Sequence, residues 1–286
     1  MKSDTARRSG LALVLILLGT AAGAAQPPAE RRNFVACPIL QDTDTVPCWL
    51  AEYDGETYFL GIQTDSGGWS PPWLGHRVLV EAKLAGGPRI CGGVPLTSDQ
   101  PASALPSGTV DGRALPNPPP VSVMRELDPS CNTMLPADPR YHIAGRRGPG
   151  PNTAESALRR FPPPAAPPVP SPPFESRTFT LHYEFDSELA ARTINEALRA
   201  VQYAQAVHAR RMTIRAYRGA ALLSDGTVLP EIAGIARLRS EEILRTLTRL
   251  GLPPSVVLDT QWSDTPQPVD GVTDPEGRRT ELEVIP

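Results

Sequence analysis

The sequence lacks the features by which most enzymes and nucleic-acid-binding proteins are recognised. Its 28 lysines and arginines are balanced by 31 aspartates and glutamates, so it has no basic excess to attract a nucleic acid. It contains no G-x-S-x-G, H-E-x-x-H or C-x-x-C motif and no glycine-rich phosphate loop. We therefore expect a protein that is not an enzyme, with no catalytic residues, no cofactor, no metal site and no nucleic-acid partner.

Long apolar segments are also missing, except for one near the N-terminus. Three basic residues precede an apolar run at 10–19, and small residues follow as far as Ala25. A positive start, a short apolar core and small residues at the end predict a cleaved secretory signal peptide over residues 1–25. The run is shorter than the about 20 residues that a membrane-spanning helix needs. The mature chain is therefore expected in the periplasm or associated with the outer membrane, without a transmembrane helix.

Cysteine is scarce, and all its copies lie in the first half of the chain, at Cys37, Cys48, Cys91 and Cys131. An even number of cysteines in an exported protein predicts disulfide bonds, because the compartment outside the cytoplasm is oxidising. Four cysteines allow three pairings. The simplest pairing joins neighbours along the chain, Cys37 with Cys48 and Cys91 with Cys131. The four histidines are scattered, so the sequence favours disulfides over a structural metal.

Proline, by contrast, is abundant, with 34 copies in 286 residues against a usual share of about 5 %. Because proline removes a backbone donor and interrupts helices and strands, one compact domain cannot hold so many. The sequence therefore predicts two domains joined by an irregular, proline-rich linker at 98–177. Eight prolines within 161–174 favour an extended polyproline II segment that acts as a spacer.

Before the linker, residues 33–97 predict a small all-β domain. Short β-rich segments alternate with turn residues, and Asp54-Gly55 is typical of a hairpin turn. A handful of short strands in such a length favours a small barrel or an open β-roll, with an OB-like fold as one form. So small a core needs support, which we expect from the disulfides.

After the linker, residues 178–286 predict an α+β domain. Segments of alternating hydrophobicity indicate strands, and apolar residues at helical spacing indicate two helices. The first helix is expected to begin after Ser187 and the second to run from about Glu231 to Leu250. The expected order is β-α-β-α-β-β, with Arg278 and Arg279 at the exposed start of the last strand.

Four segments of this domain occur in the order and spacing of a known family. They are YEFDS at 183–187, IRAY at 214–217, IARLRSEEI at 235–243 and GRRTELEV at 277–284. On these segments, residues 179–286 resemble the OmpA-like peptidoglycan-binding domain of outer-membrane protein A, peptidoglycan-associated lipoprotein and flagellar stator proteins. The N-terminal half carries no such resemblance.

The resemblance implies a ligand and a site. In that family an aspartate and an arginine hold the diaminopimelate of a cell-wall stem peptide, the arginine through a bidentate contact with its carboxylate. Arg239 stands where the family has its arginine, whereas Arg218-Gly219 stands where it has its aspartate. Asp186 and Asp225 are the acids expected to assist instead. The leading prediction is therefore a cell-envelope protein that binds peptidoglycan through Arg239, Asp186 and Asp225.

An alternative follows from the missing aspartate. A degenerate OmpA-like fold can serve as a periplasmic protein–protein interaction module, with other envelope proteins as partners. In that case the lengthened loop at 219–230 is the expected contact surface. A third hypothesis makes the N-terminal β domain the binding unit and the C-terminal domain its anchor.

Overall fold

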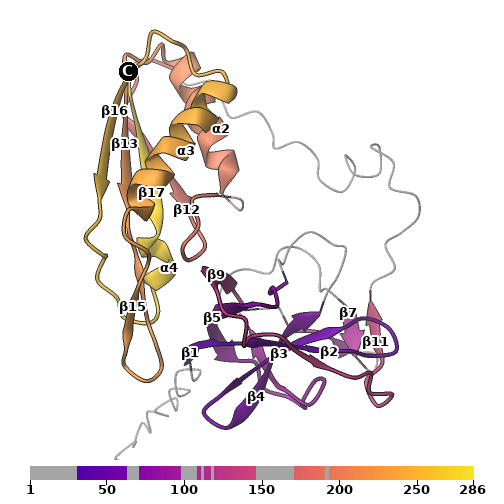
Figure 1. The fold of residues 1–286 in the computed structure, drawn as a ribbon. Coiled ribbons are helices and arrows are strands. Elements are labelled where there is room, and N and C mark those ends of the chain that lie inside the picture. Colours follow the sequence, from indigo (N-terminus) through magenta and orange to yellow (C-terminus); the bar gives the residue numbers. More distant parts are fainter. Residues whose placement is uncertain are drawn as a thin grey trace, which may run out of the picture.

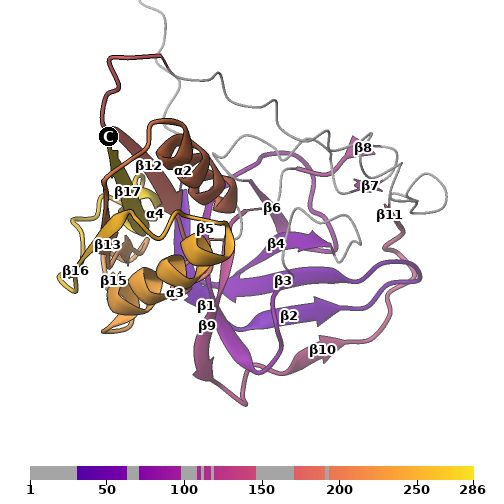
Figure 2. The ribbon, with the colours of Figure 1, turned by 90° about the horizontal axis from the view of Figure 1, so that it is seen from above.

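The computed structural model describes residues 31–62, 71–97, 108–110, 113–116, 119–145, 171–190 and 193–286. Two regions lie side by side in both views of the ribbon (Figure 1; Figure 2). A β-rich region at 31–145 is called the N-terminal region below, and an α+β region at 171–286 is called the C-terminal region. The expected signal peptide and most of the proline-rich spacer lie outside the described residues. No helix in the described ranges has the length and apolar character that a membrane span needs.

Short strands make up the N-terminal region. They are β1 (Arg31–Ala36), β2 (Pro38–Gln41), β3 (Cys48–Tyr53), β4 (Glu56–Ile62), β5 (His76–Leu84), β6 (Val94–Thr97), β7 (Gly108–Val110), β8 (Arg113–Ala114), β9 (Val121–Leu127), β10 (Thr133–Leu135) and β11 (Ile143–Gly145). One sheet has the order β1-β5-β6-β4-β3-β2-β10, with β9 paired to β5, and a second has the order β11-β7-β8. The expected hairpin turn is present: Asp54 and Gly55 join β3 to β4 with positive φ values of 52° and 71°.

Several of these strands lie in the stretch that its proline content predicts to be irregular. β7 to β11 fall between residues 108 and 145, so β structure continues well beyond residue 97. The prolines lie beside these strands and not within them, and a proline still offers its carbonyl oxygen. Pro120, which precedes β9, accepts a hydrogen bond from Glu81 N at 3.2 Å. Proline content is therefore a poor guide to where the β region ends. The OB-like form of the N-terminal region stays a prediction.

Two disulfide bonds are present, as expected from the four cysteines, but the pairing of neighbours along the chain is wrong. Cys37 pairs with Cys131 and Cys48 with Cys91, with Cα–Cα distances of 4.7 and 6.5 Å. The reason lies in the sheet: β10 runs parallel to β2, in a register that brings Cys131 level with Cys37. The bonds join residues 94 and 43 positions apart, so they tie distant segments of the N-terminal region together.

A four-stranded sheet with two helices on one face forms most of the C-terminal region (Figure 1). Its elements are β12 (Arg177–His182), α2 (Ile194–Ala206), β13 (Arg211–Tyr217), β14 (Ala220–Leu222), β15 (Val228–Pro230), α3 (Ile235–Arg249), β16 (Val257–Ser263), α4 (Asp274–Gly277) and β17 (Arg279–Ile285). The strand order is β12-β17-β13-β16. The order β-α-β-α-β-β is as expected, with the β14–β15 hairpin and α4 as additions. Both helices begin later than expected: Ile194 and Ile235 are their first residues, and the described residues 187–190, 193 and 231–234 before them are not helical.

The core of the C-terminal region lies between the sheet and the helices. Alternate residues of β13 and β17 point to the same face, because side chains alternate along a strand. On that face Met212, Ile214, Leu282 and Val284 are buried together with Ala197, Val201, Ile243 and Leu247 of the helices. The helices thus present one apolar stripe to the sheet, and Arg239 of α3 lies beside this core.

Candidate functional site

Arg239 has no exposed side-chain surface, although it was expected to contact a ligand. Its Nε donates to Ser187 O at 2.9 Å, and its Nη1 donates to Tyr217 O at 2.9 Å. The guanidinium also lies over the ring of Tyr183, 4.5 Å from the ring centre. The guanidinium also forms a bidentate ion pair with Glu231: Nη1 and Nη2 donate hydrogen bonds to the two carboxylate oxygens at 2.8 and 2.5 Å. The arginine is therefore fully engaged within its own chain.

Glu231 is equally well satisfied, and it too has no exposed side-chain surface. Its Oε1 accepts a hydrogen bond from Asp186 N at 2.9 Å, and its Oε2 accepts one from Gly219 N at 2.7 Å. We call the Arg239 guanidinium and these two N–H groups the carboxylate cradle. Such a set of donors is what a bound carboxylate requires, since a buried charge is stable only when it is paired and hydrogen-bonded.

The two residues that the sequence resemblance aligns with the family's aspartate, Arg218 and Gly219, both hold Glu231. Arg218 donates from Nε to Glu231 O at 2.7 Å, and Gly219 donates its N–H to the carboxylate. Position 219 also has no room for a side chain, because a Cβ there would lie 2.5 Å from Arg278 Cγ and 3.3 Å from Glu231 Oε2. In this chain, therefore, the residues in place of the expected aspartate help to hold the Glu231 carboxylate against Arg239.

Asp186 lies beside the cradle, but its carboxylate points elsewhere. It is buried at a positive φ of 56°, and its Oδ1 accepts a hydrogen bond from Ile232 N at 2.8 Å. Burial raises the pKa of this carboxyl above its ordinary value, and the nearby charge of Glu231 raises it further. Only the backbone N–H of Asp186 faces Glu231, so its side chain fixes the turn before α3.

Asp225 is not brought to Arg239. It lies exposed in the turn of the β14–β15 hairpin, where its Oδ1 accepts a hydrogen bond from Thr227 N at 2.8 Å. That hydrogen bond and the one from the Thr227 side chain lower the pKa of Asp225. Its charge acts on the N-terminal region instead: the pKa of Tyr53 is raised mainly by burial and then by Asp225. A role in holding a ligand at Arg239 therefore stays a prediction that this placement does not support.

The lengthened loop at 219–230 contacts the N-terminal region of the same chain. Asn33 of β1 donates its backbone N–H to Ser224 Oγ at 2.9 Å and accepts from Ser224 N at 2.7 Å. Its side-chain Nδ2 donates to the carbonyl oxygens of Leu222 and Gly271, at 3.1 and 3.0 Å. Next to these bonds, Leu79, Phe185 and Ala221 share a small buried apolar cluster. We call this contact between the two regions the junction.

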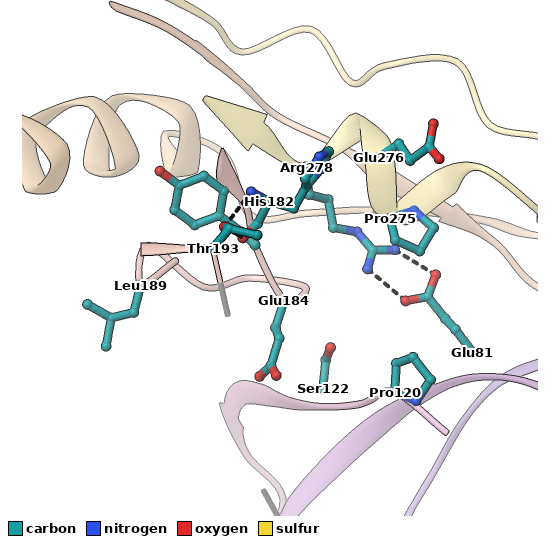
Figure 3. Close-up of a pocket in the computed structure, with 11 residues that line it drawn as sticks. Glu81, Pro120, Ser122, His182, Glu184, Leu189, Thr193, Pro275, Glu276 and Arg278 are labelled. Atoms are coloured by element: carbon teal, nitrogen blue, oxygen red, sulfur yellow. Dashed lines mark hydrogen bonds and ion pairs between the residues drawn. The ribbon is translucent and has the colours of Figure 1, made fainter. Parts of the chain in front are cut away.

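Arg278 anchors the other side of the junction, where an exposed strand start was expected. It is buried, and its Nη1 and Nη2 donate to the carboxylate of Glu81 on β5, both at 2.7 Å (Figure 3). Its guanidinium also lies 5.0 Å from the ring centre of Phe185. Sequence analysis missed both Glu231 and Glu81, because nothing in the sequence shows which carboxylate pairs with Arg239 or with Arg278.

A cavity of about 280 Å³ opens beside the Arg278–Glu81 pair, between the two regions (Figure 3). Pro120 and Ser122 line it from the N-terminal region, facing His182 and Glu184 of the C-terminal region. Ser122 Oγ accepts a hydrogen bond from Phe185 N at 3.1 Å, so this serine helps to hold the junction. Partial burial lowers the pKa of His182, against the opposing effect of the Glu276 charge. The imidazole is therefore neutral over a wider pH range than usual.

Comparisons with known proteins reach only part of the chain. No protein-family model matches it, and no curated protein sequence matches it. Among solved structures it is similar to the OmpA-like domain of FopA1 from Francisella tularensis subsp. tularensis SCHU S4, at 14 % identity and a TM-score of 0.29, over 39 % of this chain and 73 % of that one. It is also similar to a MotB-like protein from Desulfovibrio vulgaris, at 13 % identity and a TM-score of 0.29, over 38 % and 75 % of the two chains. At these values neither likeness says what this chain binds.

Proposed function

We propose that this is a non-catalytic protein of the cell envelope whose OmpA-like C-terminal region works as a protein-interaction module and not as a receptor for diaminopimelate. The contact between Glu231 and Arg239 carries this proposal. The arginine that would hold a ligand carboxylate already holds one from its own chain, and neither side chain is exposed.

Exchange of Glu231 for an external carboxylate would gain little free energy. The new ion pair would have the same chemistry as the one it replaces. Meanwhile Glu231 would lose the N–H groups of Asp186 and Gly219 as well as its arginine. A ligand carboxylate would therefore have to reproduce all of these contacts merely to restore the starting free energy.

The envelope location is supported by the two disulfides, because such bonds persist in oxidising compartments. It is also the location implied by the predicted signal peptide at 1–25. The disulfides tie segments of the N-terminal region together, and the junction joins that region to the C-terminal region. We take other envelope proteins as the partner class.

Peptidoglycan binding is the second candidate, and the resemblance of the segments around Arg239 favours it. It requires Glu231 to leave the carboxylate cradle when a stem peptide arrives. The two candidates therefore differ in one measurable respect, which is whether the intact chain binds cell-wall material through a diaminopimelate carboxylate.

Sedimentation with isolated sacculi tests the proposal. The full, disulfide-bonded chain is mixed with increasing amounts of sacculi, beside an OmpA-like domain that has both the family aspartate and the family arginine. We expect the control to sediment and this protein to stay in the supernatant. Sedimentation of this protein that free diaminopimelate reverses would overturn the proposal, and this result does not depend on the folding of any variant.

A further inference from the structure

The sheet of the C-terminal region ends in an open edge. In the part of the chain that the structure describes, β16 pairs with β13 on one side only, and it forms the outer edge of the sheet (Figure 1). An edge strand leaves a row of backbone N–H and C=O groups without partners in the sheet, and these can pair with another strand.

The hydrogen bonds on the inner side show which residues of β16 point their backbone groups outward. Val257 N donates to Arg210 O at 2.9 Å, and Ser263 O accepts from Arg218 N at 3.1 Å. Backbone direction alternates from residue to residue, so the odd-numbered positions bond to β13. Leu258, Thr260 and Trp262 therefore turn their N–H and C=O groups toward the open edge.

The side chains of β16 are unusual for a free edge. Val257, Leu258 and Trp262 are 60, 37 and 53 % exposed. Proteins commonly protect such edges with lysine, proline or a bulge. The strand has no lysine and no proline, and Asp259 is its one charged residue. An edge with three exposed apolar side chains and a single charge fits an edge that is covered by another strand.

We infer that β16 pairs antiparallel with β16 of a second copy of this chain, with a two-fold axis through Thr260. In this register Leu258 lies opposite Trp262 of the second copy, and Asp259 lies opposite Gln261 of the second copy. All seven residues of the strand find a partner. Thr260 and the Leu258–Trp262 pairs occupy hydrogen-bonded positions, which agrees with the residues whose backbone groups point outward.

The side chains complement each other in this register. Leu258 and Trp262 lie opposite Met212 and Ala216 of β13, so they belong to the helix side of the sheet and would extend its apolar face. Cross-strand pairs of an aromatic and an aliphatic side chain stabilise a sheet. The carboxylate of Asp259 lies opposite the amide of Gln261 of the second copy. A two-fold axis through Asp259 would instead place the two Asp259 carboxylates opposite each other, which is unfavourable.

The inference goes beyond the proposed function, because it concerns pairing of the chain with a second copy of itself and holds whether or not the carboxylate cradle binds a ligand. It also extends the four-stranded sheet across the two-fold axis into a continuous sheet shared by two chains. Isologous pairing of this kind closes the assembly at two copies, since the same edge is used by both.

Analytical ultracentrifugation of the full chain over a range of concentrations tests the inference. We expect a monomer–dimer equilibrium whose dissociation constant rises at least about tenfold in Trp262→Lys, which is about 1.4 kcal/mol. Trp73→Lys is the matched control, because Trp73 is also exposed, at 64 %, but lies in the N-terminal region. A monomer at all concentrations, or equal effects of the two variants, would overturn the inference.

A cysteine at the two-fold axis gives a second, independent readout. Cα atoms of a hydrogen-bonded antiparallel pair are about 5.5 Å apart, which is within the range of a disulfide. Thr260→Cys should therefore form a covalent dimer on mild oxidation, whereas Thr248→Cys on the exposed side of α3 should not. Equal cross-linking of the two variants, or none at Thr260→Cys, would contradict the register.

Discussion

Glu231 acts on Arg239 as a ligand carboxylate would, but it is held from several sides. Pro230 precedes it, and Gly234 after it adopts a left-handed φ of 84° that a residue with a side chain rarely takes. Ile232 N is fixed by Asp186, and Gly234 N donates to both carboxylate oxygens of Asp264 at 2.9 Å. The segment that carries Glu231 is thus preorganised, so closure of the carboxylate cradle is part of the fold.

Replacing Glu231 by alanine should leave a buried guanidinium without its carboxylate. We expect Glu231→Ala to lower the free energy of unfolding by about 3–5 kcal/mol, as measured by urea denaturation of the disulfide-bonded protein. The vacated cradle has the donors for a small carboxylate. Acetate should therefore raise the stability of this variant in a concentration-dependent way, because a ligand that binds only the folded state stabilises it.

The control for this experiment is Glu241→Ala on the exposed side of α3. Glu241 accepts a hydrogen bond from Arg237 at 2.7 Å, but both side chains are exposed. Exposed pairs of this kind contribute about 0.3–0.5 kcal/mol, and no cradle is emptied. A Glu231→Ala variant that matches this control in stability and in its response to acetate would show that Glu231 does not close the site.

At the scale of elements, the β14–β15 hairpin explains the length of the loop at 219–230. Its backbone reaches β1 of the N-terminal region, where Ser224 and Asn33 exchange hydrogen bonds. The same hairpin begins just after Gly219 and ends just before Glu231, so its two ends meet the carboxylate cradle. The β14–β15 hairpin therefore connects the contact with the N-terminal region, at its turn, to the carboxylate cradle, at its two ends.

Asn33→Ala should weaken the junction without disturbing either core. The variant loses the side-chain hydrogen bonds to Leu222 O and Gly271 O, and leaves both carbonyls without this donor. We expect a loss of about 1–3 kcal/mol in unfolding free energy. Backbone hydrogen exchange at Ser224 N should also quicken. Asp225→Asn in the exposed turn is the control, and equal exchange at Ser224 N in the two variants would contradict this role.

The element order of the C-terminal region was predictable because it depends on local signals. Alternation along β13 and apolar spacing along α3 are readable in a short window, and they also place Arg239 on its helix. The partner of Arg239 was not predictable, since Glu231 lies in a segment with no pattern of its own. The same holds for the cysteines: their bonding depends on the parallel register of β10 with β2, which no local pattern records.

At the scale of the whole molecule, Gly219 lies close to both buried ion pairs. A Cβ at this position would lie 2.5 Å from Arg278 Cγ and 3.3 Å from Glu231 Oε2. Arg278 pairs with Glu81 across the junction, while Glu231 pairs with Arg239 inside the C-terminal region. A disturbance at one pair therefore has a short path of packed atoms to the other, and we expect the two regions to unfold together.

Removing Glu81 tests this coupling. Glu81→Ala leaves Arg278 buried and unpaired at the junction, so we expect a loss of about 3–5 kcal/mol and two separate calorimetric transitions in place of one. The double variant Glu81→Leu/Arg278→Met should recover most of the stability and the single transition, because well-packed apolar residues can replace a buried ion pair. Arg215→Ala breaks the half-exposed pair with Glu283 on the open face of the sheet and should leave one transition. If Glu81→Ala also keeps one transition at unchanged stability, the two regions do not depend on this ion pair for their cooperative unfolding.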